Sequence, residues 1–272
     1  MRASKFLKIV AVLLAALAVF MTASCSLTGN EGEEESTTER PAVLMEAKPV
    51  SQAQILDFYN RAVNAIKAQK PGVSSSFEAS VRDVDTGDNA DAEALIEFAK
   101  NFSDALEEVN EQKEFGSDLN DFLPLKGTNT VSRLTEADIE KAEIADVEDD
   151  LYSYDLHIVL KDSDAAGPAA AAFDFDADKN EILSTFTDYR NVVEVSDYDV
   201  SYNGCEIFAR VNKETNRVTS LHLVKNCIVT ATVNFTGTLA EMGETDVSFN
   251  LQQNLEYYDF IWDAPTETVT GA

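Results

Sequence analysis

Long segments in which apolar and polar residues alternate dominate the C-terminal half of this 272-residue chain. Three of them cover about residues 200–211, 217–235 and 245–258. A period of two places successive side chains on opposite faces of an extended strand, so each segment predicts a strand with one buried face. The turn between the first two contains Asn216, a residue type that suits the left-handed conformation. The pattern therefore predicts consecutive antiparallel hairpins and a fold built on a sheet.

Helical spacing precedes these strands. Ser51–Gln54 forms a capping box, and apolar residues recur at helical intervals over residues 55–66. Alternation over residues 73–81 predicts a strand, an apolar stripe over residues 92–109 predicts a second helix, and a short third helix is expected within residues 135–145. Helices first and hairpins later favour an α+β fold. We predict an antiparallel β-sheet, able to curve strongly, with two or three helices packed on one face.

The first 25 residues have the features of an export signal. Three basic residues, Arg2, Lys5 and Lys8, precede an uncharged apolar run that ends at Met21. At about 1.5 Å per residue this run is too short for a hydrocarbon core of about 30 Å, which is typical of a signal peptide. Residues 22–25, Thr22-Ala23-Ser24-Cys25, resemble the lipobox of bacterial lipoproteins.

This resemblance implies that residues 1–24 are a cleaved signal peptide and that Cys25 carries acyl chains such as palmitate. The mature protein is then lipid-anchored on the extracytoplasmic face of the cell membrane, and its contact with the membrane is through that lipid. An ordinary secretory leader, with Cys25 incidental, is the alternative reading.

Residues 26–41, within the segment 25–45, are polar and rich in glutamate. Such a stretch buries too little apolar surface to offset its ordering entropy, so we expect an acidic disordered tether. A single α+β domain is expected over residues 46–266, followed by a tail at 267–272. The formal net charge of −28 argues against a nucleic-acid partner, because phosphate binding depends on Lys and Arg.

Motifs that carry chemistry are sparse. The sequence lacks a Gly-rich phosphate loop, a Gly-x-Ser-x-Gly elbow, a His-Glu-x-x-His pair and a Cys-x-x-Cys pair. The two histidines, His157 and His222, are both expected at solvated positions. Asp174–Asp178 has the alternating carboxylates of a calcium loop, but Lys179 stands where an EF-hand requires Gly. We therefore predict that the protein is not an enzyme and binds no cofactor or metal ion. The alternatives are a carboxylate-based hydrolase and a calcium-dependent adhesin.

Cys205 and Cys227 lie on apolar faces of neighbouring predicted strands, and an exported protein can form disulfides. If Asn212 pairs with Arg217, the residue opposite Cys205 lies three positions from Cys227. An odd number places the two cysteines on opposite faces of the sheet, unless a bulge near Lys225 shifts the alternation by one residue. We predict a structural cross-strand disulfide; two buried thiols are the alternative.

The domain is similar in architecture to half-barrel lipoproteins of the LolA and LppX type, which hold lipid between a sheet and its helices. We expect a non-enzymatic binding module, with a lipid-like or other hydrophobic ligand between sheet and helices. The residues expected to line that site are Phe77, Phe98, Phe102 and Leu223. The alternative is a structural or protein-interaction module of the cell envelope, which requires no internal cavity and packs its interior fully.

Overall fold

A computed structural model of the chain describes residues 47–87, 109–123, 125, 131–164, 167, 168, 172 and 193–264. These residues all belong to one unit, Val43–Ala272. The predicted leader with Cys25, the predicted second helix with Phe98 and Phe102, and the Asp174–Asp178 loop lie outside the described residues.

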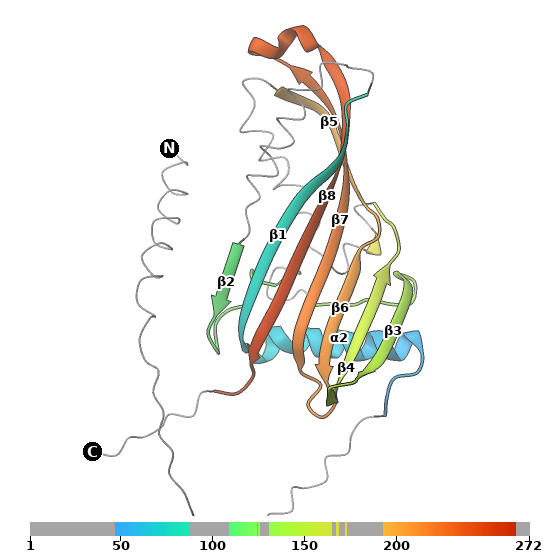
Figure 1. Cartoon of the computed structure of the whole chain (residues 1–272), viewed down its shortest axis with the longest axis vertical. Coiled ribbons are helices and arrows are strands. Elements are labelled where there is room, and N and C mark those ends of the chain that lie inside the picture. The colour runs from blue at the N-terminus through green and yellow to red at the C-terminus, as the bar shows by residue number, and fades with distance from the viewer. Residues whose placement is uncertain are drawn as a thin grey trace, which may run out of the picture. The chain divides into compact units, whose positions relative to one another are not determined.

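The described residues contain eight strands that form one antiparallel sheet (Figure 1). The strands are β1 (Gly72–Asp85), β2 (Val109–Lys113), β3 (Ile139–Val147), β4 (Asp150–Leu160), β5 (Val193–Tyr202), β6 (Glu206–Asn212), β7 (Val218–Phe235) and β8 (Glu244–Ile261). Their order is β2-β1-β8-β7-β6-β4-β3, and β5 pairs with β7 beyond the end of β6. One edge of β7 is therefore shared by β6 along its first half and by β5 along its second half.

The long hairpin of β7 and β8 confirms two of the three predicted strands. A 3-10 helix, η1 (Gly237–Met242), joins them at the end of the hairpin that lies away from α2 (Gln52–Gln69) (Figure 1). The turn between β6 and β7 has Asn216 in the left-handed region, as predicted, with φ of 52°. The remaining predicted strand is divided between β5 and β6, because Gly204 turns the chain with φ of 63°.

Helix α2 begins and ends where its sequence signals predict. Ser51 and Gln54 form the reciprocal capping box, and the helix ends at Gln69, before a left-handed Lys70. Its apolar side packs on one face of the sheet, which we call the inner face; Phe58 meets Tyr154 of β4 edge-on at 6.1 Å. The opposite face of the sheet is called the outer face.

The predicted number of helices is wrong. The described residues contain one α-helix and one 3-10 turn, not two or three helices on one face of the sheet. The helix expected within residues 135–145 is instead a turn, in which Asp138 accepts hydrogen bonds from Thr135, followed by the edge strand β3. Pairing with β4 outweighs the helical propensity of this Glu-, Lys- and Ala-rich segment, because it buries Ile139 and Ala142.

The larger core cluster lies between α2 and the inner face, and a smaller one, formed by Ala231, Val233, Phe235 and Val247, lies toward the η1 end of the hairpin. Strand β7 shows the pattern most clearly, because alternate residues from Leu221 to Phe235 are buried while their neighbours are partly or fully exposed. Strand β4 behaves in the same way, with Leu156, Ile158 and Leu160 buried and His157 on the outer face. The alternation seen in the sequence is therefore the alternation between these two faces.

The described part of the chain begins beside β3. Lys48 and Lys213 each donate to Asp146 at 2.7 Å, one from the start of the domain and the other from the β6–β7 turn. Hydrogen bonds from these two ammonium groups lower the pKa of Asp146 from 3.8 to about 2. The carboxylate thus ties the start of the domain to two turns of the sheet.

Candidate functional site

Two of the four residues predicted to line a hydrophobic site can be placed, and they share the inner face. Phe77 pairs with Leu255, which pairs with Leu223, so the three form one row across β1, β8 and β7. Leu223 is buried, whereas Phe77 is partly buried. The structure therefore brings Phe77 and Leu223 to one face, with one strand between them.

Between α2 and this part of the sheet, the described residues enclose a small cavity. A cavity of about 30 Å³ is bounded by Tyr59 and Lys67 of α2, by Leu123 and by Leu223. That volume holds about one or two water molecules, whereas sites for small organic ligands measure about 300–1,000 Å³. Burial raises the pKa of the Tyr59 hydroxyl, as expected for a phenol in a closely packed interior.

Cys205 and Cys227 are both buried thiols, so the predicted disulfide is not formed in the structure. Both lie on the inner face, because a bulge does correct the phase between β6 and β7, as the prediction required. The bulge is at Thr219, however, and not near Lys225. The Cys205 thiol instead contacts the backbone of Asn226, at 3.4 Å from its nitrogen and 3.6 Å from its oxygen.

Two polar side chains interrupt the apolar inner face at the middle of the long hairpin. Lys225 of β7 pairs with Gln253 of β8, and their exposed fractions are 6% and 4%. Lys225 therefore lies on the inner face, as Leu223 and Cys227 do. No described residue donates a hydrogen bond to Oε1 of Gln253, which is buried.

The outer face carries a different feature, a stack of three aromatic rings. His157 of β4, Phe208 of β6 and His222 of β7 are directly opposite one another on adjacent strands. The ring centroids of His157 and Phe208 are 4.5 Å apart with an interplanar angle of 8°, and those of Phe208 and His222 are 5.6 Å apart at 22°. Both histidines of the chain therefore flank one phenylalanine.

Polar contacts fix this stack at both ends. Nε2 of His157 lies 2.5 Å from a carboxylate oxygen of Glu206, and Nε2 of His222 lies 3.4 Å from the amide oxygen of Asn254. The imidazoles are thus held in defined orientations by partners one row away on the same face. Such fixation reduces the entropy that a bound partner would have to remove.

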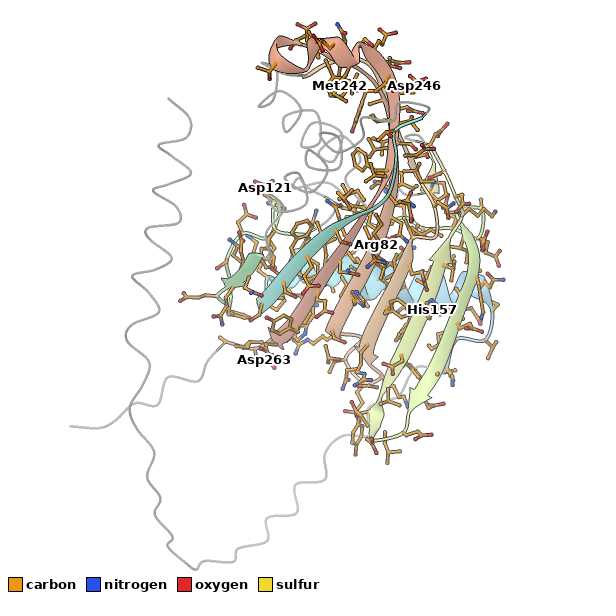
Figure 2. The ribbon with its side chains drawn as sticks, turned by 45° about the horizontal axis from the view of Figure 1, so that its top comes forward. Arg82, Asp121, His157, Met242, Asp246 and Asp263 are labelled. Carbon is orange, nitrogen blue, oxygen red and sulfur yellow. The ribbon has the colours of Figure 1, made fainter. Side chains whose placement is uncertain are left out.

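A groove of about 390 Å³ runs beside the stack, and we call it the outer groove. Its lining side chains on the outer face are Glu143, Ala145, Asp155, His157, Phe208, Arg210, Ser220 and His222. Figure 2 labels His157 on β4. Phe208 remains 36% exposed. The groove is large enough for a small ligand and open to solvent.

The ionic groups of the outer groove are paired within the protein. Arg210 binds Asp155 through two hydrogen bonds of 2.7 and 2.9 Å, and this pairing raises the pKa of the guanidinium. Glu143 lies 2.7 Å from the ammonium group of Lys141. These contacts leave the groove polar but close to neutral, on a chain of net charge −28.

A second hollow lies near the far end of the β7–β8 hairpin, where Figure 2 labels Asp246. It measures about 340 Å³ and is lined by Asp85, Asp197, Asp199 and Asp246 around hydroxyl side chains. Within the part of the chain that the structure describes, no group of three or more His, Cys, Asp or Glu side chains is arranged to hold a metal ion. This hollow is therefore an acidic surface and not a formed metal centre.

Sequence reasoning placed His157 and His222 separately and missed the stack. The juxtaposition depends on Thr219, because without the bulge Phe208 would face Leu221 and not His222. A signal was present, since Thr219 and Ser220 are consecutive polar residues between the apolar Val218 and Leu221.

No protein-family model, curated protein or solved structure matches this chain. Among the described residues, no helix combines the length and the apolar character needed to cross a membrane. The function of this chain is therefore inferred from the site itself.

Proposed function

We propose that this protein is a lipid-anchored extracytoplasmic binding module that engages its partner through the outer face of its sheet. In this proposal acyl chains on Cys25 hold it at the cell membrane, and residues 25–45 are the tether that spaces the domain from the surface. The lipobox-like residues 22–25 and the acidic composition of the tether support the anchoring. The domain acts by binding and not by catalysis.

The contrast between the two faces carries the proposal. The cavity found between α2 and the sheet has about 30 Å³, whereas the outer groove has about 390 Å³ and is open. A carrier of lipid requires the larger volume on the inside. Among the residues that the structure describes, this contrast supports an interaction module over a carrier of a hydrophobic ligand.

The anchoring is tested by replacing the predicted acylation site. Cells that express the full chain are labelled with a palmitate analogue, and the protein is partitioned between detergent and aqueous phases. We expect the native chain to be labelled and to enter the detergent phase, and Cys25→Ser to lose the label. Labelling that persists in Cys25→Ser would contradict the proposal.

The binding face is tested by a photoreactive amino acid introduced at Phe208. A matched control places the same group at Tyr152, which is 57% exposed and does not line the outer groove. We expect light-dependent adducts in cells from position 208 and none from position 152. Equal yields at the two positions, or a lipid-sized mass retained by the Cys25→Ser protein in native mass spectrometry, would favour the carrier instead.

A further inference from the structure

We infer that the outer groove binds a neutral oligosaccharide. This inference rests on the proposed function, because it names the ligand class of the same surface. The charged side chains that line the groove have partners within the protein. Asp155 is paired with Arg210 and Glu143 with Lys141, and Nε2 of His157 contacts a carboxylate oxygen of Glu206. An ionic ligand would have to displace these internal partners, whereas a neutral hydroxyl group need not.

The paired side chains retain hydrogen-bonding capacity. A carboxylate has two oxygens with about four lone-pair positions, and a guanidinium has five N–H donors. The two hydrogen bonds between Arg210 and Asp155 use only part of each set. The same pairing fixes the direction of the remaining groups, so they are preorganised to bind hydroxyls that both donate and accept.

The aromatic stack supplies the apolar component. Phe208 is covered on both faces by imidazoles, and its 36% exposed fraction therefore lies along the ring edges. The edges of the three stacked rings form an apolar ridge against which C–H groups of a sugar ring would pack through dispersion, while its hydroxyls reach the polar rim. Alternating apolar and polar contact suits a sugar, which has both kinds of group on one small ring.

Amide side chains continue the surface beyond the groove. The amide oxygen of Asn254 accepts from Nε2 of His222, and Asn226 pairs with Gln252 further along β7 and β8. Asn250 follows at the next outer-face position of β8. Each amide has donors and acceptors and no charge, so this row extends the same chemistry and favours an oligosaccharide over a single sugar.

Other occupants fit the groove less well. Anionic polymers are repelled by the net charge of −28, and a second copy of the chain would bring the same charge. A polypeptide partner is the remaining class, and the test separates it from a glycan.

The test is isothermal titration calorimetry of the Cys25→Ser full chain with chitohexaose, cellohexaose and maltohexaose. We expect at least one of them to bind with Kd of about 1 mM or tighter. Phe208→Ala should weaken binding at least about tenfold, while the control Tyr152→Ala should leave Kd within about twofold. Ala145→Arg is a second variant, since Ala145 lies exposed on the edge strand β3 and a long charged side chain there would occupy the groove without disturbing the core.

The outcomes distinguish the ligand class, a neutral oligosaccharide, from the binding surface, the outer face of the sheet. Binding that is lost in Ala145→Arg and kept in Tyr152→Ala supports the glycan. Adducts at position 208 that contain only polypeptide, with no binding of any of the three sugars, would overturn the glycan and retain the outer face as the binding surface. The absence of both adducts and sugar binding would overturn the inference and the proposed function together.

Discussion

Gln253 is a polar side chain in an apolar setting, and its replacement by methionine is expected to stabilise the protein. Its exposed fraction is 4%, and no described residue donates to its Oε1. A buried polar group without a partner costs about 1–3 kcal/mol. Methionine has the same unbranched shape and needs no hydrogen bond, so Gln253→Met keeps the packing and removes that cost. We expect the free energy of unfolding to rise by about 1–2 kcal/mol.

The assay is urea unfolding followed by circular dichroism, with a thermal scan in parallel. For a domain of this size the gain corresponds to an increase in Tm of about 2–8 °C, with the m-value unchanged. The control is Gln252→Met, one residue away on the half-exposed outer face, which should change stability by less than about 0.5 kcal/mol. A loss of more than about 0.5 kcal/mol in Gln253→Met at constant m would show that the amide is bonded, and would refute the reasoning.

Three further predictions concern single features of the fold. After denaturation without reductant, Cys205 and Cys227 should both appear as maleimide-labelled peptides; a linked peptide pair would contradict the two thiols. Asp146 should titrate by NMR with a pKa of about 2, and with a higher pKa in Lys213→Met; an unchanged pKa in the variant would contradict this assignment. The contact with the two lysines therefore stabilises the fold at neutral pH, and this stabilisation is lost as pH falls from about 4 to about 2. Gly204→Ala should lower the free energy of unfolding by about 1–2 kcal/mol because φ is positive there, and Gly204→Asn by less; equal losses in urea unfolding would point to side-chain contacts instead.

Much of the sheet could be predicted because its signals are local. The alternation along β7 and β8 specifies each strand and its buried face without knowledge of the partner strand. The same holds for the turn at Asn216 and for the capping box at Ser51, where the residue type determines the backbone conformation within a few positions. These features needed no tertiary information.

The errors arose where distant parts of the chain decide the outcome. Residues 139–147 have good helix formers, yet pairing with β4 makes them a strand. The stack of His157 on Phe208 joins strands about 50 residues apart in sequence, so composition alone could not reveal it. A single bulged residue, Thr219, then sets the register that brings His222 to the same stack.

The place of β1 in the sheet imposes an order on folding. Strand β1 lies between β2 and β8, and its first residue, Gly72, pairs with Ile261 near the end of β8. A chain delivered N-terminus first during synthesis therefore leaves one edge of β1 open until the last strand arrives. Such non-local closure is slow, and open edges invite aggregation. A nascent chain cut short after β7 would have two unpaired long edges, so the tendency of this domain to aggregate should be highest before its final strand is in place.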